Sequence, residues 1–296
     1  MFAVRQSIMV ESQPLDIASL QAWVGRTESR PDQVTAAPMA ALSATLDRDD
    51  PPPKPGDPLP PLAHWLYFLP IHRQSELGAD GHAKLGGFLP PIPLPRRMWA
   101  GTRVEFRHPL RVGEEIVRES RIAKVEHKQG RTGDLVFVQV RHEIRNAAGV
   151  ALVDEHDIVY RPGPQPGDPA PPPPPQAPTD HAWERLIQPG DVLLFRYSAL
   201  TFNGHRIHYD RRYVTEVEGY PGLVVHGPLQ ATLLVDLLRR CLPEAGVKRF
   251  AFRAVSPLFD TAPFAVCGKL EADGHTVQLW TRNSTGGLAM SATATI

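Results

Sequence analysis

The segment TFNGHRIHYD, residues 201–210, gathers side chains that can hold and transfer protons. It contains Asn203, His205, His208 and Asp210. The glycine after Asn203 permits a tight turn, and Asp210 suits the first turn of a short helix over the residues that follow. His208 then stands at a loop-to-helix junction, where histidine is a natural proton carrier because it titrates near neutral pH. A histidine beside a turn is more often structural than catalytic, so this interpretation depends on a second motif nearby.

The second motif is the run EGYPGLVVHGPLQATLL, in which Gly227 opens a helix that is apolar on nearly every side. The first turn of a helix presents N–H groups without an internal partner, and the helix dipole adds partial positive charge there. Glycine lets a ligand approach this backbone closely. We predict that the Gly227 N–H faces an oxygen that becomes negative during a reaction, and that Gly222, Val225 and His226 contact the substrate. Packing or capping at the helix entrance is the alternative role for His226.

A proline-rich stretch divides the chain into residues 1–161, a linker at 162–179, and residues 180–296. Proline cannot donate to a sheet ladder, so this stretch is expected to be a stiff, extended spacer. Each part on either side has one or two helical patterns followed by alternating strands with Gly and Asp-Gly turns. We predict an α+β fold in which each part wraps an antiparallel sheet round a buried helix.

The individual elements follow from local pattern. Helices are expected at 19–25, 37–46 and 226–242. Strands are expected at 102–110, 115–130, 133–149 and 150–161 before the linker, and at 247–259, 264–274, 275–286 and 288–296 after it.

Composition excludes several classes of protein. Formal net charge is zero, with 42% hydrophobic and 22% charged residues, which is typical of a globular protein and gives no reason to expect a nucleic-acid partner. Cys241 and Cys267 form no metal-binding spacing and no disulfide framework. The first residues lack the pattern of a secretory signal, and no apolar run has the length of a membrane span. We therefore expect a cytoplasmic protein without a metal site or membrane association.

The segment from Asn203 to Gly227 resembles the MaoC-like, or hydratase 2, enoyl-thioester hydratases. Their motif is roughly D-x-N-P-[IL]-H-x-D, followed by an apolar-His-Gly helix start. By this resemblance His208 falls on the catalytic histidine and Gly227 on the glycine whose N–H polarises the thioester carbonyl. Asn203 stands where the family usually has aspartate, while His205 and Arg206 replace the asparagine and proline of the motif.

These departures leave three alternatives. Asn203 could orient a water that His208 alone deprotonates, which is the interpretation we favour. The carboxylate partner could instead have moved, with Asp210 or Glu218 the nearest, or this copy of the site could be inactive. An amide cannot accept a proton as a carboxylate does, so the difference matters.

The segment PLPRRMWAGTRVEFRHPLRVGEE, residues 93–115, is similar to the N-terminal half of two-domain hydratases and type 2 hydroxyacyl-thioester dehydratases. The resemblance implies a double hotdog, with two antiparallel sheets each wrapped round a central helix, a non-catalytic first half and a catalytic second half. It implies reversible hydration of an α,β-unsaturated acyl-CoA, short and branched or dicarboxylic, such as mesaconyl-C4-CoA, with no cofactor. A homodimer is compatible with such a fold.

Other functions remain open from the sequence. They are dehydration of linear (R)-3-hydroxyacyl thioesters, acyl-CoA thioester hydrolysis on the same architecture, and binding of acyl-CoA without catalysis. If the substrate carries a free carboxylate, a cation must meet it. Arg96, Arg97 and Arg206 are the candidates, and each could equally be a solvated surface arginine.

Overall fold

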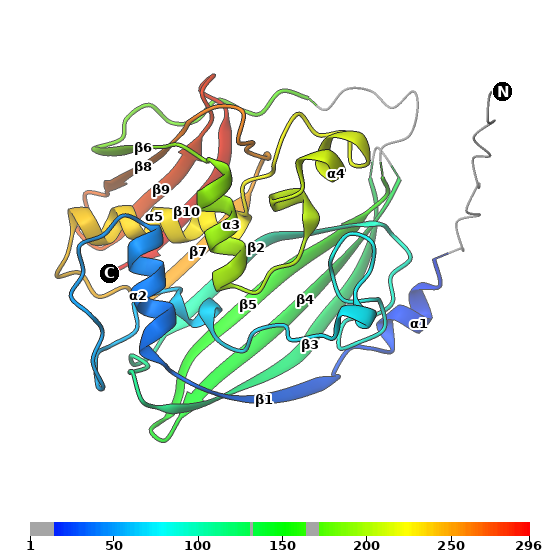
Figure 1. Cartoon of the computed structure of the whole chain (residues 1–296), viewed down its shortest axis with the longest axis horizontal. Coiled ribbons are helices and arrows are strands. Elements are labelled where there is room, and N and C mark those ends of the chain that lie inside the picture. The colour runs from blue at the N-terminus through cyan, green and yellow to red at the C-terminus, as the bar shows by residue number, and fades with distance from the viewer. Residues whose placement is uncertain (1–14, 131–132, 164–171) are drawn as a thin grey trace.

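Antiparallel strands pair into one continuous sheet across the computed structural model, which describes residues 15–130, 133–163 and 172–296. Within these residues ten strands follow the order β1-β3-β4-β5-β2-β7-β10-β9-β8-β6 (Figure 1). Residues 164–171 of the predicted linker lie outside the described residues. The division into domains at 161 and 180 stays a prediction, and "first half" and "second half" here mean the residues before and after the linker.

The strands lie close to where the sequence patterns place them. Those of the first half are β1 (Thr27–Gln33), β2 (Arg96–Phe106), β3 (Glu115–Gly130), β4 (Gly133–Asn146) and β5 (Gly149–Arg161). Those of the second half are β6 (Trp183–Ile187), β7 (Arg249–Ala254), β8 (Phe264–Leu270), β9 (Thr276–Arg282) and β10 (Leu288–Thr295). Eight strands match the predicted segments, whereas β1 and β6, at the two ends of the sheet, were not predicted.

The prediction of two antiparallel sheets, one in each half, is wrong in one respect, because β2 pairs with β7 and joins the halves into a single sheet. The pairing runs from Gly101 opposite Arg253 to Glu105 opposite Arg249. A side chain at Gly101 would lie 2.7 Å from the Phe252 carbonyl oxygen, so only glycine lets the two strands approach this closely. An unpaired strand edge exposes N–H and C=O groups, and pairing β2 with β7 satisfies the edges of both halves.

The second half contains the long buried helix that its sequence predicts. It is α5 (Gly227–Cys241), which lies against β6, β8, β9 and β10, and every residue from Leu229 to Leu238 is buried. The helix is apolar on nearly every side, which leaves no broad face for solvent, and its buried Gln230, Thr232 and Asp236 have hydrogen-bond or ion-pair partners. The shorter α3 (Asp191–Leu200) and α4 (Arg211–Glu216) lie between β6 and α5 in the chain.

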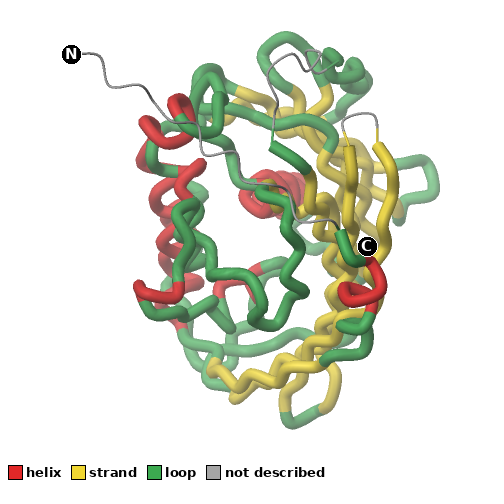
Figure 2. The backbone as a smooth tube through the Cα atoms, turned by 90° about the vertical axis from the view of Figure 1, so that its right-hand side faces the viewer, coloured by secondary structure: helices red, strands yellow, loops and turns green. Residues whose placement is uncertain are grey.

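The first half has no helix equivalent to α5 within the described ranges, so the prediction of a central helix in each half is also wrong. Its helices are the short α1 (Ile17–Gln21), which contacts β3, and α2 (Ala36–Thr45), which packs against α3. Figure 2 shows the strands on one side of the molecule and most helices on the other. The inner face of β2–β5 is therefore left to line a cavity.

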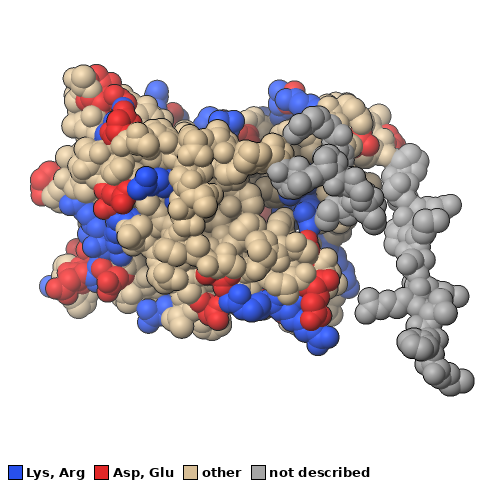
Figure 3. Space-filling view, turned by 90° about the horizontal axis from the view of Figure 1, so that it is seen from above, with Lys and Arg blue, Asp and Glu red and all other residues tan. Residues whose placement is uncertain are grey.

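Surface charge is mixed. Basic and acidic side chains are interspersed over the face seen in Figure 3, without one broad patch of a single sign. Among the helices of the described residues, none combines the length and the apolarity that crossing a membrane requires.

Candidate active site

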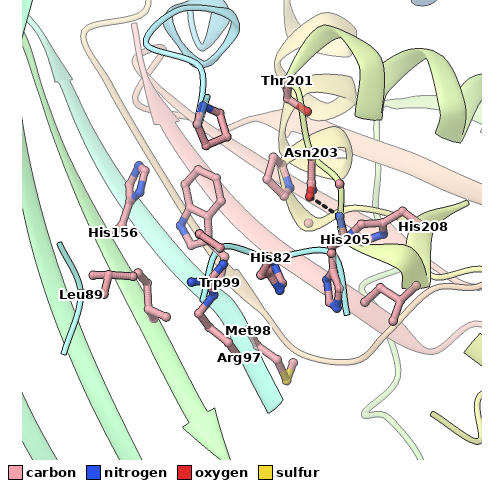
Figure 4. A pocket seen from close by; sticks show the side chains of 18 of the residues that line it. His82, Leu89, Arg97, Met98, Trp99, His156, Thr201, Asn203, His205 and His208 are labelled. Carbon is pink, nitrogen blue, oxygen red and sulfur yellow. Dashed lines mark hydrogen bonds between the residues drawn. The ribbon is translucent and has the colours of Figure 1, made fainter. Parts of the chain in front are cut away.

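A cavity of about 1820 Å³ lies between the two halves. One wall is the segment 203–208, here called the histidine loop, together with the start of α5. The opposite wall comes from the inner face of the first-half sheet. Side chains of that wall include Arg97, Trp99, Arg118, His142, His156 and Tyr160. Figure 4 shows Trp99 and His156 facing the labelled residues of the histidine loop.

His208 is held in one tautomer. It ends a short 3-10 helix, is only 8% exposed, and its Nδ1 lies 2.7 Å from the carbonyl oxygen of Val224. Because a carbonyl only accepts, Nδ1 carries the proton and Nε2 keeps a free lone pair. Burial lowers the pKa of His208 to about 4, against the raising effect of the Val224 hydrogen bond, and the neighbouring His82 lowers it further. At neutral pH the ring is therefore a neutral proton acceptor.

The ring of His208 lies against the entrance of α5. His226, the N-cap residue of that helix, stacks on it with ring centroids 3.7 Å apart and 20° between the planes. His226 Nε2 lies 2.8 Å from the Ser198 hydroxyl, and the residue is 1% exposed. It is not among the residues that line the cavity, so it supports His208 from behind.

Asn203 faces the cavity from the turn before His208. Its side-chain oxygen accepts the backbone N–H of His205 at 3.0 Å, drawn as a dashed line in Figure 4. The backbone N–H of Asn203 donates to the Ser198 carbonyl at 2.8 Å. The amide oxygen is thus engaged within the loop, and the NH₂ group is left as the part that can meet a ligand.

Of the three remaining predicted site residues, two line the cavity and one does not. Gly227 lines the cavity, and a Cβ added there would have only the Trp99 carbonyl oxygen nearby, at 3.9 Å, so a ligand can approach its backbone. Val225 also lines the cavity. Gly222 does not: a side chain there would overlap Asp260, whose carboxylate accepts the Leu223 N–H at 2.8 Å. Close packing against Asp260 therefore explains why a glycine is needed at position 222.

The two carboxylates that the sequence left open as alternative bases are both engaged elsewhere. Asp210 caps α4 by accepting the Tyr213 N–H at 3.0 Å and forms an ion pair with Arg206 at 2.7 Å. Glu218 forms an ion pair with Arg96 at 3.1 Å.

A loop of the first half also reaches the site, and no sequence pattern predicted it. Residues 78–82, here called the docking loop, contact the histidine loop directly. Arg206 donates to the backbone carbonyls of Asp80 and Ala79 at 2.9 and 3.0 Å. Gly81 has φ +89° and packs so closely that a Cβ would overlap the Gly204 carbonyl oxygen. Only the folded chain brings these two glycines together.

The docking loop places an acid–imidazole pair beside His205. His82 Nδ1 lies 2.9 Å from the Asp80 carboxylate, and the rings of His82 and His205 are 4.0 Å apart. Burial would raise the pKa of Asp80, but the hydrogen bonds and charge of His82 outweigh it, so the carboxyl stays ionised. Ligand atoms of these three residues all lie within 4.8 Å of one another, a spacing that could also hold a metal ion.

A polar band crosses the otherwise apolar inner face of the first-half sheet. Its centre is Asp154, 1% exposed, whose carboxylate lies 2.8–3.0 Å from ring nitrogens of His156, His64 and Trp65 and also accepts the Thr102 hydroxyl. His142 adjoins it, with its ring 4.6 Å from that of His156. Burial would raise the pKa of Asp154, but the histidines hold it well below its usual value. This wall of the cavity is therefore suited to polar as well as apolar ligand groups.

Comparison with known proteins gives consistent matches. Residues 62–260 match the family described as hydroxyacyl-thioester dehydratase type 2. The chain is 47% identical over 278 residues to mesaconyl-C(4)-CoA hydratase of Chloroflexus aurantiacus, covering 93% of this chain and 97% of that protein.

Two solved structures support the fold. A MaoC-like dehydratase from Phytophthora capsici matches with a TM-score of 0.67 and 11% identity, over 95% of this chain and 97% of that one. A Mycobacterium tuberculosis protein with a double hotdog fold matches with a TM-score of 0.57 and 14% identity, over 92% and 96%. The predicted α+β double hotdog is confirmed as a fold, but its two sheets are joined into one, and within the described residues only the second half has the predicted long central helix.

Proposed function

Because the chain belongs to the hydroxyacyl-thioester dehydratase type 2 family, we propose that it adds water reversibly to the double bond of a short dicarboxylic enoyl-CoA such as mesaconyl-C4-CoA. The chain is a hydro-lyase of the hydratase/dehydratase type. The observation that carries the proposal is the position of His208, a neutral imidazole with a free Nε2, against the first turn of α5.

The thioester carbonyl accepts the Gly227 N–H, so negative charge that develops on this oxygen meets the positive end of the α5 dipole. One such donor contributes about 2.7–4 kcal/mol to transition-state stabilisation. Water lies between His208 Nε2 and the Asn203 NH₂ group, and its oxygen attacks the β-carbon. His208 takes the water proton and returns it to the α-carbon of the enolate. An imidazolium with a pKa near 4 is a strong acid, so this second transfer is favourable.

The dicarboxylic substrate is supported by the near full-length likeness to a mesaconyl-C(4)-CoA hydratase and by the polar band and arginines in the cavity wall. A second candidate is dehydration of linear 3-hydroxyacyl thioesters. The size of the cavity favours it, because about 1820 Å³ exceeds the roughly 300–1,000 Å³ of an ordinary ligand pocket and has room for a longer acyl chain.

A substrate panel tests the proposal. Loss of enoyl-thioester absorbance is followed with mesaconyl-C4-CoA and with linear enoyl-CoA esters of increasing length, at equal enzyme concentration. We expect the highest kcat/KM with the dicarboxylic ester. A higher value for a medium or long linear chain would replace the proposal with the second candidate. The cytoplasmic location and a homodimer stay predictions, the latter open to measurement of the mass in solution.

A further inference from the structure

Arg97 and Tyr160 are cross-strand neighbours on the cavity wall. They are directly paired in the register of β2 with β5, and both line the cavity. Directly opposite residues of an antiparallel pair project from the same face with Cβ atoms about 4.5–5.5 Å apart. Figure 4 shows Arg97 beside His82 and Trp99, on the wall that faces the histidine loop.

Tyr160 has a buried hydroxyl in need of a partner. The residue is 1% exposed, and within the described part of the chain its oxygen has no partner at good hydrogen-bond geometry, although the Arg97 guanidinium lies close enough to oppose the rise of its pKa. Buried polar groups nearly always have a partner, so one without a protein partner points to a ligand. Burial raises the pKa of Tyr160, and the hydroxyl is therefore a donor at neutral pH.

Among the arginines near the histidine loop in the described part of the chain, Arg97 is the one without an acidic partner. Arg96 pairs with Glu218 and Arg206 with Asp210, whereas Arg97 has no ion pair among the residues that the structure describes. Its positive charge reaches the site. Burial is the main cause of the lowered pKa of His205 and of His82, and the charge of Arg97 lowers both pKa values further. The side chains of Arg97, His82 and His205 also surround a small side cavity of about 40 Å³.

We propose that Arg97, with Tyr160 beside it, binds the free carboxylate of a dicarboxylic enoyl-CoA substrate. This rests on the proposed function. In mesaconyl-C4-CoA the carboxylate is bonded to the carbon that receives water, so its partner must lie close to the water held at His208. Arg97 adjoins His82 and His205, and the ring of His205 is 5.4 Å from that of His208. A guanidinium fork and a phenol together satisfy both carboxylate oxygens.

Arg118 is the competing cation in the same cavity. It lies on β3, beyond the polar band. Its guanidinium is 4.0 Å from the Glu28 carboxylate and lies over the Phe68 ring, 5.2 Å from the ring centroid. Its charge is therefore partly balanced within the first half, and Arg118→Gln is the matched control for Arg97→Gln.

The experiment compares two substrates that differ only in the substituent that Arg97 and Tyr160 are proposed to bind. Mesaconyl-C4-CoA carries a carboxylate where 3-methylcrotonyl-CoA carries a methyl group. The ratio of kcat/KM for the first to kcat/KM for the second is measured for the wild type and for Arg97→Gln, Arg97→Lys, Tyr160→Phe and Arg118→Gln. We expect the ratio to fall on the order of 10²-fold in Arg97→Gln, less in Arg97→Lys, which keeps the charge, and about tenfold in Tyr160→Phe. It should stay unchanged in Arg118→Gln.

The outcomes separate this inference from the proposed function. A wild type that prefers the dicarboxylic ester, together with an Arg97→Gln variant that keeps the same preference, overturns the inference alone. A fall in the ratio with Arg118→Gln instead assigns the carboxylate to Arg118 and also overturns it. A wild type that hydrates linear esters and not mesaconyl-C4-CoA rejects the proposed function, and the inference with it.

Discussion

The imidazoles of His208 and His226 stack face to face, with centroids 3.7 Å apart, although they come from different segments of the second half. Burial, and then the charges of His208 and His205, lower the pKa of His226 well below its usual value, so the inner ring stays neutral. The stack fixes the plane of His208 while the Val224 carbonyl fixes its tautomer. Because His208 also lines the cavity, Nε2 is the ring nitrogen left available to a ligand.

Replacing His208 tests the central assignment. His208→Ala removes the proton acceptor, and we expect kcat to fall by at least about 10²–10⁴-fold, which is the usual contribution of general acid–base catalysis. His275→Ala is the control, because His275 is exposed and is not among the cavity-lining residues. Initial rates are measured with the best substrate of the panel, and circular dichroism checks that each variant is folded. Near-normal turnover by folded His208→Ala would reject the site.

The acidic limb of the pH profile should lie unusually low for a histidine. Since the pKa of His208 is lowered to about 4, its neutral, active form persists down to about pH 5. We expect kcat/KM to fall tenfold per pH unit only below about pH 4, measured as initial rates after a brief pH jump. A limb centred near 6.5, the ordinary value for histidine, would contradict the buried tautomer described above.

The same lowered pKa makes stability depend on pH. In the unfolded chain His208 binds a proton below about pH 6.5, whereas in the folded protein it binds a proton only below about pH 4. The stabilisation is thus complete above 6.5 and is lost as pH falls through this window, by roughly 3 kcal/mol of unfolding free energy. Urea unfolding at pH 7, 6 and 5 measures the slope, and His208→Gln should make it shallower. Equal slopes in the two proteins would show that His208 does not titrate in this way.

Restoring the carboxylate of the family motif should be tolerated. In Asn203→Asp the side-chain oxygen still accepts the His205 N–H, and the added negative charge favours the imidazolium form of nearby groups. We expect activity to persist and the acidic limb of kcat/KM to move to higher pH. Asn203→Ala, the control, loses both groups, and kcat/KM should fall roughly 5- to 10-fold, as for the loss of one hydrogen bond. An inactive Asn203→Asp variant would mean that the NH₂ group is indispensable.

The close approach of the two loops predicts a large effect from one methyl group. Gly81→Ala introduces strain from φ +89° and an overlap with the Gly204 carbonyl, so the histidine loop must shift. Gly56→Ala is the matched control, since Gly56 has φ +88° but nothing within 4 Å of an added Cβ. We expect Gly56→Ala to lose only about 1–2 kcal/mol of stability and Gly81→Ala to lose more, with a fall in kcat. Equal effects on melting temperature and on kcat would show that the contact does not position the site.

Much of the second half could be predicted from its sequence because local signals there agree. The all-round apolar run of α5 has one stable placement, and the glycine and proline at its start mark its entrance. The 3-10 turn at His208 and the helix capped by Asp210 follow from local turn and capping chemistry. These features place the histidine loop beside the start of α5 without knowledge of the first half.

The rest of the fold depends on contacts between distant segments, which leave no local pattern. The strand TESRPDQ of β1 shows no apolar alternation, since its side chains are intermediate or exposed throughout. The docking loop carries Asp80 and His82 in a stretch without helix or strand period, and its meeting with Gly204 exists only after folding. In the same way Asp154 looks like an ordinary charged position in β5 until the fold brings it against His64, His156 and Trp65.

The ladder between β2 and β7 also governs how a ligand can enter. Backbone hydrogen bonds tie the wall bearing Arg97 and Trp99 to the sheet that supports α5, and a hinge at this seam would have to break them. We therefore expect the two walls to keep a fixed separation, so that the acyl group enters a preformed cavity without closure of one half on the other.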